Sequence, residues 1–261
     1  MAGRVVPLLF FLSLSGYALS LNTHTGAGTG EPSSFGSVAQ IMVLVNPGRV
    51  QAYDYKSRFP DIQVEFVTAL DTTAFGDTEQ MLANETYLPM SEEMKAQWRA
   101  NTENENNFLR HRALGSLSCA LGHYKMWMQA ASMKEGEWAV ILEDDAEPQT
   151  TLADLRTFMS TVDTSKYVVF LGNRHCTRGM GSAAYAVTAD GAKYLLSQVA
   201  FENADHMLSH VPALKTHCAY APGGRFFFIH KPVDATSTSM KALLLLSVKK
   251  VLSFLTRMVG L

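Results

Sequence analysis

The chain has 261 residues, of which 47% are hydrophobic and 18% are charged, and its net charge at pH 7 is −2. This length supports one sizeable domain with a hydrophobic core, and the apolar fraction excludes wholesale disorder. The near-neutral charge gives no general indication of a nucleic-acid partner, so none is expected.

The first 20 residues have the layout of a secretory signal peptide. A positive Arg4 precedes a mostly apolar run from Val5 to Leu12, and small residues lie near Ala18. The run is short for a membrane span, although an uncleaved signal anchor stays open as an alternative. Residues 21–38 are expected to form a flexible linker before a folded domain over residues 39–235. The leader predicts a protein that is secreted or stays in the lumen of the endoplasmic reticulum or Golgi.

Short apolar runs alternate with helical patterns along the chain. Strands are expected over Gln40–Asn46, Gln63–Ala69, Trp138–Asp144, Tyr167–Gly172, at the start of 183–200 and within 223–230. Helices are expected between the first two strands, over Ser91–Arg99, over 115–132, over 151–159 and late in 183–200, while 71–107 reads as a polar excursion above a sheet edge. This order predicts an α/β fold with a mainly parallel central sheet covered by helices on both faces.

Residues 236–261 combine apolar residues with several lysines and arginines. Such a basic amphipathic helix can lie on a membrane surface. Packing of the helix against the domain is an equal alternative.

Two further features agree with passage through the secretory pathway. Asn84 begins the sequon Asn-Glu-Thr, which predicts an N-linked glycan. Three cysteines are too few for a disulfide scaffold but permit one bridge, for which Cys176 and Cys218 are the candidates in an oxidising lumen. Cys119 is interpreted as a packing residue.

Three acids, Glu143, Asp144 and Asp145, directly follow the buried strand that begins at Trp138. Ligands of open α/β sheets bind outside the carboxyl ends of strands, so this position favours a site. If the strand continued, Glu143 and Asp145 would share a face and Asp144 would point away. Carboxylates suit Mg²⁺ or Mn²⁺, and substrate phosphates normally complete such a coordination shell. A solvated acidic loop is the simpler alternative for the triplet alone.

Several ordered blocks together resemble glycosyltransferase family 25, which includes lipooligosaccharide and procollagen galactosyltransferases. The blocks are GSLSCALGHYKMW (115–127), AVILEDDAEP (139–148), AAYAVTADGAKYLL (183–196) and FENADHML (201–208). The likeness spans roughly Gln40 to Val233. The chain departs from the family at Gly122, where a serine is usual, and in the turn after the first strand.

The resemblance implies a GT-A-like nucleotide-sugar-binding domain that transfers a hexose, galactose or glucose, from a UDP-sugar to an acceptor hydroxyl on a glycan or glycoprotein. It also implies metal assistance by Mn²⁺ or Mg²⁺ and inversion at the sugar. Asp145 and Glu143 are then the expected metal ligands, with His230 as a further one. Asp205 is the expected catalytic base, and Glu202 is the reserve candidate.

Six residues are expected on the donor side of this site, namely Asp144, His123, Tyr185, Arg174, Asn46 and Arg49. For His123 a structural role is equally compatible with the sequence, and for Tyr185 core packing is. Two other functions stay open: a secreted carbohydrate-binding protein with the same fold and no turnover, and a metal-dependent phosphohydrolase. The phosphohydrolase would need more His and Asp ligands at strand ends than the sequence offers.

Overall fold

The structure is a computed structural model that describes residues 36–47, 54–102, 110–178 and 181–230. The expected leader, almost all of the linker, Arg49 and the C-terminal amphipathic helix lie outside the described residues.

A six-stranded sheet forms the centre of the fold, with the strand order β2-β1-β3-β6-β5-β7. Only β6 runs against its neighbours, since β2, β1 and β3 are mutually parallel and β5 is parallel to β7. The strands are β1 (Ser37–Val45), β2 (Gln63–Thr68), β3 (Glu137–Glu143), β5 (Val168–Phe170), β6 (Ala184–Thr188) and β7 (Thr216–Cys218). A separate antiparallel pair, β4 (Ala146–Pro148) and β8 (Phe228–His230), continues from the end of β3.

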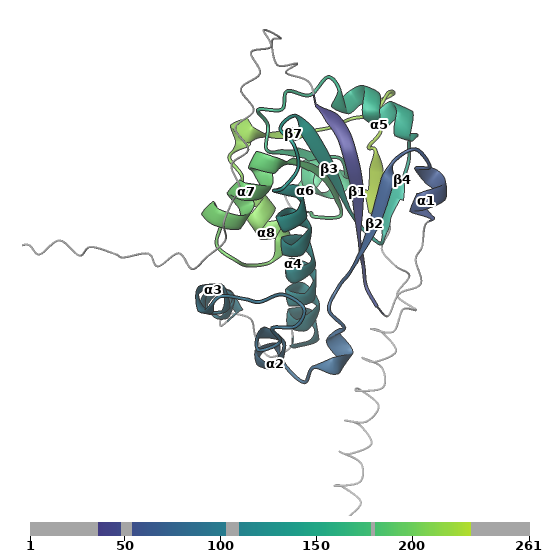
Figure 1. The fold of residues 1–261 in the computed structure, drawn as a ribbon. Helices are drawn as coiled ribbons and strands as arrows, with labels where there is room; N and C mark the ends of the chain where they lie inside the picture. Colours follow the sequence, from purple (N-terminus) through teal and green to yellow (C-terminus); the bar gives the residue numbers. More distant parts are fainter. Residues whose placement is uncertain (1–35, 48–53, 103–109, 179–180, 231–261) are drawn as a thin grey trace, which may run out of the picture. The chain divides into compact units, whose positions relative to one another are not determined.

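Helices cover both faces of this sheet (Figure 1). One face carries α4 (Arg110–Ala130), α7 (Ala189–Gln198) and α8 (Ala204–Ser209), and the other carries α1 (Tyr55–Arg58) and α5 (Leu152–Met159). The remaining helices are η1 (Thr72–Ala74), α2 (Thr78–Leu82), α3 (Glu92–Thr102), α6 (Asn173–Arg178) and η3 (Ala213–Lys215). The mixed α/β architecture with a mostly parallel sheet confirms the expected fold class.

Two hydrophobic cores follow from the alternation of side chains along β3. Ala139 and Ile141 belong to the core beneath α4, whereas Trp138, Val140 and Leu142 belong to the core beneath α1 and α5. All five side chains are fully buried, as expected for a parallel strand covered on both sides. The same alternation directs Glu143, two residues after Ile141, toward α4.

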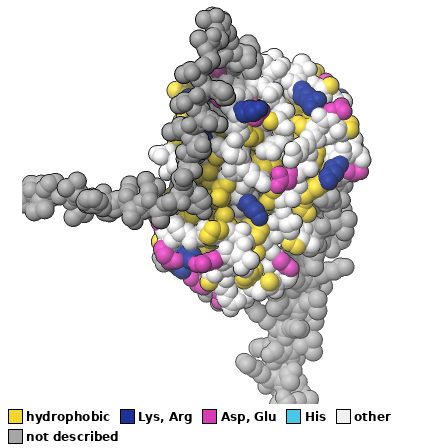
Figure 2. Space-filling view, in the orientation of Figure 1, with side chains coloured by type: hydrophobic (Ala, Val, Ile, Leu, Met, Phe, Trp, Pro, Cys, Tyr) yellow, Lys and Arg dark blue, Asp and Glu magenta, His cyan; other side chains and the backbone are white. Residues whose placement is uncertain are grey.

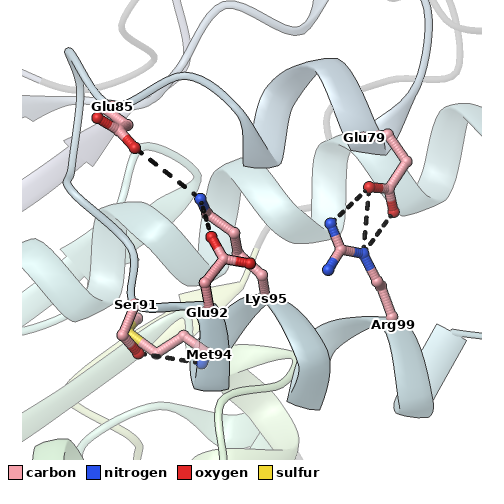
Figure 3. A network of polar contacts seen from close by, with 7 residues as sticks. All are labelled: Glu79, Glu85, Ser91, Glu92, Met94, Lys95 and Arg99. Atoms are coloured by element: carbon pink, nitrogen blue, oxygen red, sulfur yellow. Dashed lines mark hydrogen bonds and ion pairs between the residues drawn. The ribbon is translucent and has the colours of Figure 1, made fainter.

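The polar excursion after β2 folds as η1, α2 and α3, and ion pairs tie its helices together (Figure 3). Arg99 on α3 makes a two-pronged contact with Glu79 on α2, with N–O distances of 2.7 and 2.9 Å. Lys95 Nζ lies 2.7 Å from Glu92 and 4.0 Å from Glu85. Trp98 is buried in the core beneath α4, so the excursion belongs to the domain's core and does not only lie above it.

Local sequence features explain where several elements begin and end. Thr151 and Asp154 form the capping box at the start of α5. No turn separates β6 from α7, because Thr188 ends the strand and also caps the helix by accepting a hydrogen bond from the Gly191 amide. The expected helix between β1 and β2 is described only over the four residues of α1.

Basic and acidic side chains lie interspersed among apolar and uncharged ones on the face shown in Figure 2. In the described ranges, every helix is too short or too polar to cross a bilayer.

Candidate functional site

The carboxyl ends of β1 and β3 meet at the point where the strand order reverses. From β1 the chain goes to β2 on one side and, later, to β3 on the other. Open α/β sheets bind ligands at such a switch point. Glu143 is the last residue of β3, and Asp144 and Asp145 form the turn that leads into β4. The strand thus ends before alternation could orient Asp145.

Tyr55 holds this acidic turn from the side of α1. Its hydroxyl contacts the backbone carbonyl oxygens of Ala146, at 2.7 Å, and Glu143, at 3.2 Å. The Asn46 amide at the end of β1 donates to Asp144 Oδ2 at 3.0 Å. Asp144 is buried, with 5% of its surface exposed, and turns toward β1. These contacts fix the backbone on which the acids stand, so the Asp144 carboxylate has a structural role here.

The Glu143 carboxylate accepts a hydrogen bond from the residues before β6 and lies beside His123 of α4, whose buried Nε2 has no hydrogen-bond partner among the described residues. Ser182 Oγ donates to its Oε1, and His123 Nε2 lies 3.4 Å from the same oxygen. Burial alone would raise the pKa of Glu143, but His123, Ser182 and His230 together lower it to about 2. The carboxylate is therefore ionised throughout the physiological pH range.

His123 is fully buried and makes a second contact on its other ring nitrogen. Its Nδ1 lies 2.8 Å from the Tyr185 hydroxyl oxygen, which also accepts a hydrogen bond from Trp127 Nε1 at 2.8 Å. Tyr185 is paired across the strands with Ile141, which places it on the α4 face beside the end of β3. The expected donor-side residues His123 and Tyr185 thus lie behind Glu143, inside the core.

Asp145 faces the second, smaller sheet. Its Oδ2 lies 3.3 Å from Nε2 of His230 at the end of β8, and Arg174 Nη1 lies 3.4 Å from the same nitrogen. Asn173 Oδ1 accepts a hydrogen bond from the His230 amide, which ties α6 to β8. Asp145 raises the pKa of His230, and nearby Arg174 opposes this shift. The structure therefore brings together the expected ligands Asp145 and His230 with the expected phosphate contact Arg174.

A second group of potential ligands lies deeper. One ligand atom each from Cys119, His123 and Glu143 falls within a mutual distance of 4.8 Å, which is compatible with a metal ion. The set shares Glu143 with the group around Asp145. Cys119 was interpreted from the sequence as a packing residue, but it belongs to a group of side chains that could hold a metal ion.

The two candidate bases have different surroundings. Glu202 lies 2.8 Å from His210 Nε2 and 3.4 Å from His206 Nδ1, both of which are exposed. Asp205 is partly buried in the first turn of α8, where Asn203 and not Asp205 caps the helix. Asp205 contributes to the electrostatic shifts of the Tyr185 and His175 pKa values, so it faces the α4 side of the sheet.

Two further expected features are a disulfide and a candidate glycosylation site. Cys176 in α6 is joined to Cys218 in β7 by a disulfide with a Cα–Cα distance of 5.8 Å. Asn84 is partly exposed, and its Oδ1 accepts from the amides of Thr86 and Tyr87.

One known protein family has a sequence model that matches the part of the chain around the end of β3. Residues 53–174 fit the model of glycosyltransferase family 25, described as LPS biosynthesis protein. Over these residues the chain is similar to glycosyltransferase family 25, which indicates a glycosyltransferase. No curated protein matches the chain. The matched range includes His123, the acids Glu143–Asp145 and Arg174 of this glycosyltransferase, and it ends before Tyr185 and Asp205.

Sequence reasoning assigned no site role to Trp127, Ser182, Tyr55 or Asn173. Trp127 follows Cys119 and His123 at intervals of four, so all three lie on one face of α4. That spacing could have indicated a common role. Ser182 lies two residues before β6, and no pattern in its neighbourhood predicts a contact with Glu143.

Proposed function

We propose that this glycosyltransferase transfers a hexose, galactose or glucose, from a UDP-sugar to an acceptor hydroxyl on a glycan or glycoprotein, with the assistance of Mn²⁺ or Mg²⁺. The observation that supports the proposal best is the pair of Asp145 and His230, 3.3 Å apart, next to the ionised Glu143 where β3 ends beside the switch point. The family match supports the general activity, and these residues support the choice of a phosphate-bearing donor.

The residues at this position fit a divalent cation of the hard type. Glu143 is held ionised, and Asp145 is 7% exposed, with its carboxylate against the His230 imidazole. Asp145 and His230 could supply a carboxylate and an imidazole to Mn²⁺ or Mg²⁺, with substrate phosphates supplying further oxygens, whereas the ligand atoms of Glu143 group with Cys119 and His123. When bound, the cation would act as a Lewis acid on the leaving nucleotide diphosphate.

Arg174 is the proposed second contact of the donor diphosphate. Its guanidinium lies beside His230 and therefore next to Asp145, on a helix that Asn173 ties to β8. A guanidinium can donate two parallel hydrogen bonds to phosphate oxygens. In this position it would orient the diphosphate relative to the acids.

We propose Asp205 as the base that accepts the proton of the acceptor hydroxyl during an inverting transfer. A positioned carboxylate typically contributes about 10²–10⁴-fold to such a step. Asp205 is electrostatically coupled to Tyr185, whereas Glu202 is engaged by two surface histidines. These surroundings favour Asp205 over Glu202.

We also propose a location in the secretory-pathway lumen or outside the cell. The disulfide between Cys176 and Cys218 supports an oxidising compartment, and the partly exposed Asn84 supports glycan attachment. Expression of the full chain in eukaryotic cells, with glycosidase treatment and compartment-specific fractionation, tests this. A cytosolic protein without a glycan would contradict it.

The activity is tested by incubating the purified full chain with a panel of nucleotide sugars and a mixture of glycan acceptors, and measuring released nucleotide. We expect release from one UDP-hexose, dependent on Mn²⁺ or Mg²⁺ and abolished by a chelator. Release that continues in the chelator would contradict the metal proposal. Binding of glycans without release from any donor would instead support a carbohydrate-binding protein without turnover.

A further inference from the structure

A mostly buried carboxylate at the start of α8 lies between two imidazoles. The Glu202 side chain is 14% exposed, and its Oε1 lies 2.8 Å from Nε2 of His210. Its other oxygen, Oε2, lies 3.4 Å from Nδ1 of His206. Within the described ranges, no lysine or arginine forms an ion pair with this carboxylate. Its charged partners there are two histidines, whose own side chains are 52% and 61% exposed.

The geometry of α8 places the two imidazoles on the same side of the helix. His206 and His210 are four positions apart, and the His210 amide donates to the His206 carbonyl oxygen at 3.2 Å, as in an α-helix. Side chains at this spacing are neighbours on a helix surface. Asn203 caps the helix, so Glu202 comes directly before it and its side chain extends along the first turns.

The Glu202 carboxylate has little contact with water and therefore needs a positive partner. Buried charges in proteins are paired with an opposite charge or bound to a metal ion. An imidazole is positive only when both of its nitrogens carry protons. A metal ion bound to neutral imidazoles supplies the positive charge without that second proton. The surroundings of Glu202 thus favour a cation between the three side chains.

The distances between these atoms are close to those in the coordination shell of zinc. Zinc binds His nitrogen and Glu oxygen at about 2.0–2.2 Å in a tetrahedral shell, so two of its ligand atoms are about 3.3–3.6 Å apart. The separation of 3.4 Å between Glu202 and His206 lies in this range. The separation of 2.8 Å between Glu202 and His210 reaches it by a small rotation of an exposed ring. Two imidazoles favour zinc over Mg²⁺ or Mn²⁺, which prefer oxygen ligands.

We propose that Glu202, His206 and His210 form a zinc site on the surface of the domain, with a water molecule in the fourth position. The ion joins the residue before α8 to the residue that ends it, and so stabilises the helix that carries Asp205. The site shares no residue with the pair of Asp145 and His230, and it does not depend on the proposed transfer reaction.

Zinc binding is tested by NMR of the ¹⁵N-labelled histidine side chains in the full-length, metal-free protein during titration with Zn²⁺ alone. We expect the signals of His206 and His210 to shift together, with the pattern of direct coordination at Nδ1 and Nε2 respectively. The variants His206→Gln and His210→Gln assign the signals. His217 is exposed on β7, stacks on Phe158 and should keep its signal. An unchanged signal of either His206 or His210 at a large excess of Zn²⁺ would overturn the site.

The contribution of each ligand is measured by competition with a zinc-binding dye. A partner that only orients a ligand changes affinity by about 10–100-fold, so loss of a direct ligand should lower the affinity for one Zn²⁺ ion by more than about 100-fold. We expect this loss in His206→Gln, His210→Gln and Glu202→Gln, the last of which removes only the charge. His217→Gln is the matched control and should bind as wild type. The same number of tightly bound ions in wild type and in any of the first three variants would overturn the proposal.

Co²⁺ absorption spectra separate this site from the group of Cys119, His123 and Glu143. Cobalt bound by a thiolate gives an intense charge-transfer band in the near ultraviolet, whereas imidazole and carboxylate ligands give only the weaker visible bands. We expect visible bands that are lost in His210→Gln. A thiolate band alone, unchanged in His210→Gln, would assign the ion to Cys119 and overturn the proposal.

The effect on α8 is measured by hydrogen exchange of the amides of Met207 and His210, which donate within the helix. We expect Zn²⁺ to slow this exchange in wild type but not in His210→Gln. Equal slowing in the two proteins would overturn the link between the ion and the helix.

Discussion

The backbone amide of Asn46 and the carboxylate of Asp144, 98 positions apart in sequence, are joined by a hydrogen bond of 3.0 Å. This bond ties the end of β1 to the turn formed by Asp144 and Asp145. Because of this bond, Asp144 has a structural role that differs from the roles of its neighbours Glu143 and Asp145. Removing it should therefore affect the framework of the site.

We expect Asp144→Ala to lower the free energy of unfolding by about 1.5–3 kcal/mol, the usual contribution of a hydrogen bond to a charged group. Asp144→Asn retains an acceptor oxygen and should lose less. Urea unfolding followed by circular dichroism measures both. Equal losses in the two variants would contradict a role that depends on accepting the Asn46 amide.

Asp145→Asn should remove metal-dependent donor turnover and leave the fold intact, because an amide is a much poorer ligand for a hard cation than a carboxylate. Nucleotide release at a series of Mn²⁺ concentrations measures the effect. Asp190→Asn, a change at an exposed acid on α7 that pairs with Lys193, is the control and should behave as wild type. Full turnover of Asp145→Asn in the presence of a chelator would rule out the assigned role.

Asp205→Asn should lower kcat by about 10²–10⁴-fold with donor binding nearly unchanged, since it removes the proposed base. Its stability should change little, because Asn203 provides the cap of α8. Steady-state kinetics and donor titration separate the two quantities. Glu202→Gln should retain most of its turnover. The reverse result, with Glu202→Gln inactive and Asp205→Asn active, would transfer the role to Glu202.

The pair of His230 and Asp145 predicts a dependence of stability on pH in the metal-free protein. The folded-state pKa of His230 is raised above its ordinary value of 6.5, chiefly by Asp145. Its contribution to stability is therefore fully present below pH 6.5 and is lost as the pH rises through the raised value. With a chelator present, wild type should exceed His230→Gln in unfolding free energy more at pH 5.5 than at pH 9. A larger difference at pH 9 would contradict the coupling.

Much of the fold could be predicted because local patterns specify it. The apolar run from Trp138 to Leu142 is continuous because β3 is covered on both faces, and the spacing of Thr151 and Asp154 marks the start of α5. The reversed direction of β6 could not be predicted. Strand direction depends on how the chain returns to the sheet, and hydrophobic periodicity carries no information about it.

The sequence could predict those residues of the candidate site that lie at the end of a strand. Glu143 ends β3 and Asp145 lies in the turn that follows, where ligands of open α/β sheets bind. The contact of His123 with Tyr185 joins residues 62 positions apart, and no sequence pattern encodes it. The place of Cys119 in a group with His123 and Glu143 likewise depends on how α4 packs against the end of β3.

The reversal of β6 has a consequence for how variation in this protein would act. Because β6 runs against β3, its beginning and not its end lies beside Glu143, so Ser182 reaches Glu143 and Tyr185 reaches His123 from the start of the strand. The segment between β5 and β6 therefore sets the reach of both side chains at once. A single insertion there would displace an anchor of Glu143 and the partner of His123 together, while the same insertion after β6 would leave both in place.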